Sequence, residues 1–324
     1  MGKKVDIKKA VADAGKAAAE LSAKSKEGIV KALDQDGDGK LDAKDFALVR
    51  DLLAEKQTQI RREADRKKLR PIFEEDLDKA DFQMSKLIRV AEMDKKHADS
   101  EICIGSVGFD AVYKDLRVVN IYPDKTDAFG LSFYPDADNG IYYVDPSDRD
   151  YYIALDDYFN YLRVARVSEL QRIAQELGAK HFRVTYKEQK KSFTKTDARV
   201  KLEAKDTTKH GGKAEADHKA EQSSFEKVEI AAEMECIGHK PVAPTLKYFK
   251  KDPQIQSLIA LRMADNEITH QVYTLVLSNS SGIKVKDAMK IDAALSAMKI
   301  SGDATVTSEA QSEARRFFEY EIDF

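Results

Sequence analysis

The spacing of apolar residues changes near residue 100, and this change sets the expected fold class. In residues 1–100 apolar side chains recur at intervals of three and four, as on amphipathic helices. Beyond residue 100 they form short runs, rich in β-branched and aromatic residues, that Gly, Pro and Asp interrupt. We therefore expect an α+β fold with a helical N-terminal module followed by a mixed domain.

The chain has 324 residues, enough for about two domains. A helix is predicted over residues 5–33. A second helix follows an acidic loop and ends before Pro71, because proline disfavours a helical conformation in the residue before it. We expect three parts along the chain: a helical module over residues 1–70, a connecting helix over residues 71–100, and an α+β domain over residues 101–324.

The C-terminal domain is predicted to contain long antiparallel strand pairs. Four segments alternate apolar with polar residues, as strands with one buried face do. These segments are residues 181–188, 227–236, 271–278 and 318–324. The first two bracket a polar insert at about residues 193–225, and the last two bracket another at about 282–300. Residues 304–314 also alternate with period two, a pattern that an extended hairpin or a helix could explain.

Two further predictions concern the middle of the chain. Residues 155–177 keep helical spacing and stop at Gly178, which predicts one amphipathic helix with a glycine at its C-terminus. Aromatic runs flank the dipeptide Asn139-Gly140, a sequence that favours tight turns, so a β-hairpin is predicted over residues 131–144.

Residues 34–45 form an acidic loop with the spacing of a site for a hard divalent cation. Carboxylates stand at loop positions 1, 3, 5, 9 and 12, and Gly39 at position 6 permits a sharp turn. Lys40 at position 7 would contribute only its backbone carbonyl. The loop and its flanking helical stripes, residues 29–53, resemble the EF-hand family and a dockerin-type repeat. The resemblance implies a Ca²⁺ site, which could also accept Mg²⁺, formed by Asp34, Asp36, Asp38, Lys40, Asp42 and Asp45.

The loop departs from the EF-hand pattern in two ways. Asp45 stands at position 12 in place of the usual bidentate Glu, so we expect moderate affinity and a weaker preference for Ca²⁺ over Mg²⁺. EF-hands generally work in pairs, but the acidic residues 74–81 lack the central glycine and the register of a second loop. The hand would then be paired across a homodimer, packed on another helix pair, or purely structural. The alternative without metal is a solvated acidic loop between helices.

The polar insert allows a second interpretation. Ala198, Val200, Leu202 and Ala204 alternate with charged residues, and alanines alternate similarly beyond Gly211-Gly212. In layout this pattern, together with residues 304–314, resembles the two membrane hairpins of gasdermin-like and perforin-like pore formers. Alanines bury little surface, however, and Ala, Lys and Glu are common in solvated linkers and helices. We favour the solvated insert over the membrane hairpin.

The sequence contains one candidate for a catalytic site. A run of aspartates interleaved with tyrosines could supply paired carboxylates to a hydrolase, although turns and a half-buried tyrosine layer explain it better. Its members are Asp136, Asp138, Asp145, Asp148, Asp150, Asp156 and Asp157, with Tyr142, Tyr143, Tyr151, Tyr152, Tyr158 and Tyr161. The sequence contains no phosphate-binding glycine loop, serine-nucleophile elbow or paired zinc-ligand motif. The six histidines show no paired-ligand spacing. His210 and His218 could meet across the turn of the polar insert, but surface histidines in a polar loop are the favoured interpretation.

The composition of the chain limits the classes of partner and the cellular location that we expect. The 54 basic and 57 acidic residues give a net charge of −3, which argues against nucleic acid as a partner. No apolar run is long enough for a spanning helix, and residues 1–6 lack the features of a signal peptide. Cys103 and Cys236 are expected to be reduced thiols of a cytoplasmic protein. The sequence therefore predicts a calcium-binding intracellular protein of structural or interaction type, which could be a homo-oligomer.

Overall fold

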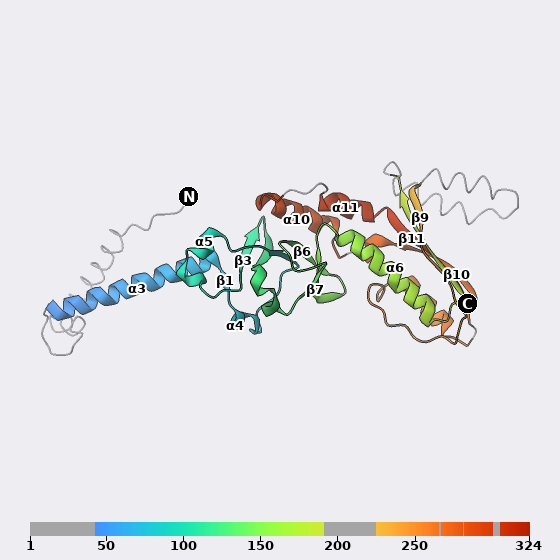
Figure 1. The fold of residues 1–324 in the computed structure, drawn as a ribbon, viewed down its shortest axis with the longest axis horizontal. Helices are drawn as coiled ribbons and strands as arrows, with labels where there is room; N and C mark the ends of the chain where they lie inside the picture. The colour runs from blue at the N-terminus through green and yellow to red at the C-terminus, as the bar shows by residue number, and fades with distance from the viewer. Residues whose placement is uncertain (1–42, 191–224, 266, 281, 301–304) are drawn as a thin grey trace, which may run out of the picture. The chain divides into compact units, whose positions relative to one another are not determined.

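A computed structural model describes residues 43–190, 225–265, 267–280, 282–300 and 305–324. The chain divides into two compact units, Met1–Arg70 and Pro71–Phe324. In the first unit, helix α3 spans Ala43–Leu69 (Figure 1). The helix ends before Pro71, as predicted, and the amide of Arg70 donates to the carbonyl of Arg66 at 2.8 Å. The helix predicted over residues 5–33 lies outside the described residues.

The second unit is built on two sheets, which confirms a mixed α+β class. The larger sheet has seven strands in the order β1-β3-β4-β2-β6-β7-β5, and the β2–β4 and β5–β7 pairs are parallel while the others are antiparallel. Its strands are β1 (Pro71–Ile72), β2 (Leu87–Val90), β3 (Gly108–Tyr113), β4 (Leu116–Ile121), β5 (Ser132–Tyr134), β6 (Gly140–Asp145) and β7 (Asp148–Ala154). Short 3₁₀ helices occupy Glu101–Cys103, Pro123–Phe129 and Leu277–Asn279.

The smaller sheet has four antiparallel strands in the order β10-β11-β8-β9. Its strands are β8 (His181–Gln189), β9 (Phe225–Glu235), β10 (His270–Val276) and β11 (Arg316–Asp323). All four strands predicted in the C-terminal half are thus confirmed. The C-terminal strand β11 lies between β10 and β8, an order that the alternation of apolar residues could not predict.

Helix α6 (Tyr158–Glu176) connects the two sheets, and it confirms the helix predicted over residues 155–177. Its first turns bury Tyr158 and Leu162 in a core shared with the seven-stranded sheet. Its last turns bury Leu170 and Ile173 against the inner face of the four-stranded sheet, together with helix α9 (Pro253–Arg262) (Figure 1). A single helix therefore contributes to both cores.

Gly178 ends α6 for a steric reason as well as a conformational one. Its φ is +75°, a left-handed conformation that favours glycine. A Cβ at this position would also lie 1.9 Å from the backbone carbonyl oxygen of His239. The glycine thus lets the segment that follows β9 pass directly over the end of the helix.

The connecting helix predicted over residues 71–100 is wrong. This segment contains β1 and β2 with two short helices, α4 (Glu74–Leu77) and α5 (Lys95–Ala98). Strand β2 lies inside the sheet between β4 and β6, and its residues Leu87, Ile88 and Val90 are at most 1% exposed. A strand buried on both faces is apolar without alternation, so its spacing can match that of a helix.

The hairpin predicted over residues 131–144 is also wrong in its pairing. Strands β5 and β6 exist at the predicted places, but β7 lies between them, parallel to β5 and antiparallel to β6. The tight connection is instead the β6–β7 turn, where the Asp145 carboxylate accepts from the Ser147 amide at 2.7 Å. The Asn139-Gly140 segment forms a wider connection. The Tyr142 hydroxyl lies 2.8 Å from the carbonyl oxygens of both Asp136 and Asp138, so the two carbonyls share its hydrogen bond.

The second polar insert, at about residues 282–300, contains a core helix. Residues 285–297 form α10 (Val285–Ala297), which buries Ala288, Ile291 and Ala294. The following segment, whose period-two alternation allowed a strand or a helix, contains helix α11 (Val306–Glu313), whose Val306 and Ala310 are buried. Ala and Ser occur at both period two and helical spacing here, so tertiary packing decided the conformation.

Candidate functional site

The outer face of the four-stranded sheet carries its charged side chains. Strand residues alternate between faces, and the inner face supplies the core residues Phe182, Tyr320 and Ile322. On the outer face the register places His270 opposite Asp323, and Asp323 opposite His181. Polar side chains from neighbouring strands therefore meet in rows across this face.

One of these rows forms a continuous polar network over all four strands. His270 Nδ1 lies 2.6 Å from Asp323 Oδ1, and His181 Nδ1 lies 3.2 Å from the other carboxylate oxygen of Asp323. On its far side, His181 Nε2 lies 3.3 Å from Glu233 Oε1, to which Arg183 Nε donates at 2.8 Å. Two imidazoles therefore share the carboxylate of Asp323.

The network changes the pKa values of its members in a consistent direction. Burial lowers the pKa of His181, but its hydrogen bonds to Asp323 and Glu233 outweigh burial and raise that pKa overall. The hydrogen bond with His270 lowers the pKa of Asp323, and the hydrogen bond from Arg183 lowers that of Glu233. Both carboxylates are therefore held in the ionised form, which accepts hydrogen bonds and binds cations.

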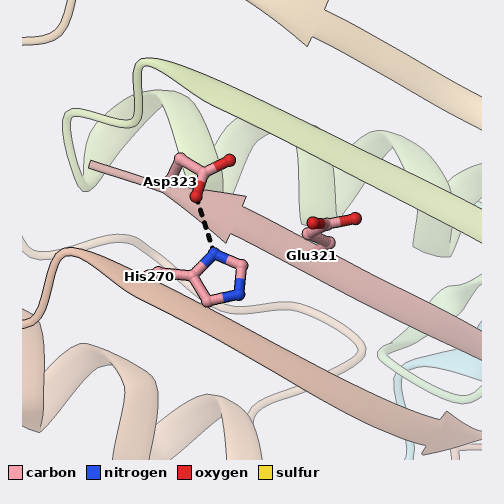
Figure 2. Close-up of side chains that lie close together, drawn as sticks. All are labelled: His270, Glu321 and Asp323. Carbon is pink, nitrogen blue, oxygen red and sulfur yellow. Dashed lines mark hydrogen bonds and ion pairs between the residues drawn. The ribbon is translucent and has the colours of Figure 1, made fainter. Parts of the chain in front are cut away.

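Glu321 brings a second carboxylate to the His270 end of the network. Glu321 precedes Asp323 by two residues on β11, so both side chains lie on the outer face, as Figure 2 shows. One potential ligand atom each from His270, Glu321 and Asp323 lies within 4.8 Å of the other two. An imidazole nitrogen and two carboxylate oxygens are suitable ligands for a divalent transition metal.

The predicted Ca²⁺ loop lies at the edge of the described chain. Its ligands up to position 9 lie outside the described residues; these are Asp34, Asp36, Asp38, Lys40 and Asp42. The backbone of Asp45 lies in the first turn of α3, which begins at Ala43, loop position 10. Helix α3 therefore begins within the last three positions of the predicted loop, and the EF-hand resemblance stays a prediction.

The Asp and Tyr residues considered for hydrolysis do not form one cluster. Tyr142 and Tyr152 belong to the core on one side of the seven-stranded sheet, while Tyr143 and Tyr158 belong to the core that also contains α10 and α11. Two of these hydroxyls have structural partners: that of Tyr152 donates to the carbonyl of Ser85 at 2.6 Å, and that of Tyr158 to the carbonyl of Val144 at 3.3 Å. The alternation of strands β6 and β7 separates side chains that are adjacent in sequence.

Asp145 is the buried carboxylate of that set, at 2% exposure. It accepts hydrogen bonds from the amide and hydroxyl of Ser147 and, at 2.7 Å, from the hydroxyl of Tyr248. The remaining aspartates of the set, residues 136, 138, 148, 150, 156 and 157, are exposed or half-buried. The contacts of Asp145 hold the β6–β7 turn against the segment before α9, so its role here is structural.

Sequence reasoning missed the histidine network. The histidines were expected at the surface without a shared site, because His181 and His270 are far apart in the chain and form no local motif. The available signal was that His181 begins a predicted strand, that His270 directly precedes another, and that Asp323 is the last residue but one of the C-terminal predicted strand. Only the order and register of the four strands brings these positions together.

The membrane-hairpin prediction concerns residues that the structure largely does not describe. Nearly all of the insert at residues 193–225 lies outside the described residues, and β9 begins at its last residue, Phe225. Within the described ranges no helix has the length and apolar character needed to cross a membrane. No protein-family model matches the chain, and neither a characterised protein nor a solved structure shows significant similarity to it.

Proposed function

We propose that the protein binds Ca²⁺ at residues 34–45 and acts as a structural or interaction protein inside the cell. The observation that carries the proposal is the loop itself, with five carboxylates and a central glycine at the spacing of an EF-hand. The start of α3 at Ala43 supports it, because the last ligand, Asp45, then belongs to a helix rather than to a flexible tail.

The ligand chemistry favours a hard cation. The carboxylates of Asp34, Asp36, Asp38 and Asp42 and the carbonyl of Lys40 are all oxygen donors, which Ca²⁺ and Mg²⁺ prefer. Asp45 is shorter than the glutamate usual at position 12 and would donate one oxygen. The site would then hold Ca²⁺ moderately and accept Mg²⁺ more readily than an EF-hand with a bidentate glutamate.

The chain has a single EF-hand-like loop, and the simplest interaction role for it is to pair with the loop of another chain. A second copy of the chain would supply the partner hand, so we propose a homo-oligomer in which two loops pair. Cys103 is a buried free thiol and Cys236 a half-buried one, which supports a reducing compartment such as the cytoplasm. The mass of the protein in solution with and without Ca²⁺ tests the pairing.

Calorimetric titration of Ca²⁺ into the full chain tests the site. Asp34→Ala with Asp38→Ala should abolish binding, because it removes two of the coordinating carboxylates. Asp78→Ala with Asp81→Ala is the matched control, since it removes two exposed carboxylates from an acidic stretch without the loop register. Unchanged Ca²⁺ affinity in the loop variant would refute the proposal, as would an equal loss in the control.

Position 12 can be tested by lengthening its side chain. Asp45→Glu should raise the affinity for Ca²⁺ relative to Mg²⁺, because a longer arm can place both of its oxygens on the ion and Mg²⁺ tolerates fewer ligands. Competition titrations with both metals measure this ratio. A ratio equal to that of the wild type would mean that Asp45 does not coordinate.

A further inference from the structure

We propose that His270, Glu321 and Asp323 form a second metal site, separate from the Ca²⁺ loop, that binds a divalent transition metal such as Zn²⁺. The three side chains come from the adjacent strands β10 and β11 and lie together on the outer face of the four-stranded sheet (Figure 2). Nothing in the local sequence around any one of them indicates such a site.

The spacing of the ligand atoms fits a metal ion after a small movement. A tetrahedral Zn²⁺ with bonds of about 2.0–2.2 Å holds its ligand atoms about 3.3 Å apart. The three potential ligand atoms lie within 4.8 Å of one another, and His270 Nδ1 and Asp323 Oδ1 are 2.6 Å apart. Side-chain rotations alone can bring Glu321 closer and let the ion enter between His270 and Asp323, because all three side chains are at least partly exposed.

The backbone fixes the positions of His270 and Asp323, which are the two ligands farthest apart in the sequence. His270 pairs directly with Asp323 in the β10–β11 register, which holds their Cα atoms opposite each other. Glu321 and Asp323 project from the same face of one strand, two residues apart. A site built on paired strands is more rigid than one built on loops, so little ordering is needed when the ion binds.

The neighbouring residues of the same polar network hold the ligands in place. The oxygen of Asp323 that does not face His270 is bound by His181, which is itself held by Glu233. Such outer partners orient a coordinating carboxylate and are often needed for full affinity. We therefore assign His181 as a positioning residue of the site and not as a ligand.

The donor set selects the class of metal. One imidazole nitrogen with two carboxylate oxygens suits Zn²⁺ and its first-row neighbours, whereas Ca²⁺ requires six to eight oxygen donors. The side chains of His270 and Asp323 are 53% and 41% exposed, so an ion has access and water can complete its coordination. The two sites of the chain would thus differ in the ions that they prefer.

Zinc titration of the full chain in saturating Ca²⁺ tests the inference. We expect one Zn²⁺ per chain, with affinity reduced at least about 10-fold in His270→Ala and in Glu321→Gln, because each removes a ligand. His181→Ala should reduce affinity by about 10-fold while leaving the number of sites unchanged. Because the substituted side chains are all at least partly exposed, these variants should keep the wild-type fold, and circular dichroism checks this. Co²⁺ absorption should show a tetrahedral spectrum that His270→Ala abolishes.

Matched controls separate this site from other histidines. His239→Ala removes an exposed imidazole that hydrogen-bonds the neighbouring carbonyl of Lys240, and it should leave Zn²⁺ binding unchanged. The double variant His210→Ala with His218→Ala should do the same. The inference is overturned if His270→Ala and Glu321→Gln bind Zn²⁺ like the wild type, or if these controls lose it. Asp34→Ala with Asp38→Ala should lose Ca²⁺ but keep Zn²⁺, so the two proposals fail independently.

Discussion

Arg166 and Glu313 form an ion pair inside the protein, and removing one partner should be strongly destabilising. Their side chains are 0% and 3% exposed, and Arg166 Nη1 lies 3.2 Å from Glu313 Oε2. At this distance the attraction is about 5 kcal/mol for an effective dielectric constant of about 20, and desolvation of the ions offsets much of it. Arg166→Met leaves Glu313 buried, with Arg316 at 3.7 Å as a weaker partner. We expect the free energy of unfolding to fall by about 3–5 kcal/mol.

The loss should depend on pH because Glu313 keeps its ionisable group. Burial raises the pKa of Glu313 even with Arg166 beside it. An acid whose pKa is raised by folding stabilises the fold fully below its unfolded pKa, and this contribution is lost as the pH rises through the folded pKa. Without Arg166 the folded pKa rises further, so Arg166→Met should be more destabilising at pH 8 than at pH 5, by up to about 1.4 kcal/mol per pH unit.

Urea unfolding followed by circular dichroism at both pH values measures these quantities. The control is Arg166→Met with Glu313→Leu, which removes both charges and should be closer to the wild type than Arg166→Met alone. Arg316 keeps Glu309 and Glu188 as partners in that variant. Glu313→Leu is measured alone as well. The reasoning is refuted if the loss in the double variant equals the sum of the losses in the two single variants, or if Arg166→Met costs the same at pH 5 and pH 8.

Three further predictions concern packing and ionisation. Gly178→Ala should destabilise by at least about 1 kcal/mol more than Gly105→Ala in thermal unfolding, because both glycines have positive φ but only Gly178 faces backbone, at His239. Burial raises the pKa of Tyr143 to about 12, so stability should fall as the pH rises from about 10 towards 12. If Tyr143→Phe lowered the phenolate absorbance at pH 10 while the fold was intact, this prediction would be contradicted. Ile291→Ala in α10 should lose about 2–5 kcal/mol in urea unfolding, whereas a solvated insert would lose less than about 0.5 kcal/mol.

Elements with one buried face could be predicted from the sequence. Strands β8, β9, β10 and β11 alternate because α6 and α9 cover one face and leave the other exposed, so the period of two is visible. Helix α6 was predictable because Gly178 marks its end and its buried residues keep helical spacing. In these segments local pattern and tertiary environment agree.

Segments with other environments were misassigned or left open for identifiable reasons. Strand β2 is buried on both sides, so it has no polar face to reveal a period of two. Helix α11 alternates Ala and Ser with polar residues, a pattern compatible with either conformation, and packing against α10 decided the outcome. The pairing of β5 with β7 depends on contacts between strands, which no local spacing encodes.

The same distinction applies to the two proposed metal sites. The Ca²⁺ loop lies within residues 34–45, so its ligands share one short motif that the sequence displays directly. The proposed site at His270, Glu321 and Asp323 depends on the pairing of β11 with β10, which brings together residues from separate parts of the chain. A site of the first kind can be read before the fold is known, and one of the second kind cannot.

The geometry of the four-stranded sheet also separates the proposed transition-metal site from Gln189 and Phe225, the two strand residues that flank the long insert. Strand β8 begins at His181 beside the site and ends at Gln189, which pairs with Phe225 at the start of β9. At a rise of about 3.3 Å per residue, the ends of this strand lie roughly 25 Å apart. The insert therefore leaves and rejoins the sheet at the end opposite Asp323. Any influence of a bound metal on those two anchoring residues must pass along the strands, through their shared hydrogen bonds and the inner core that they cover.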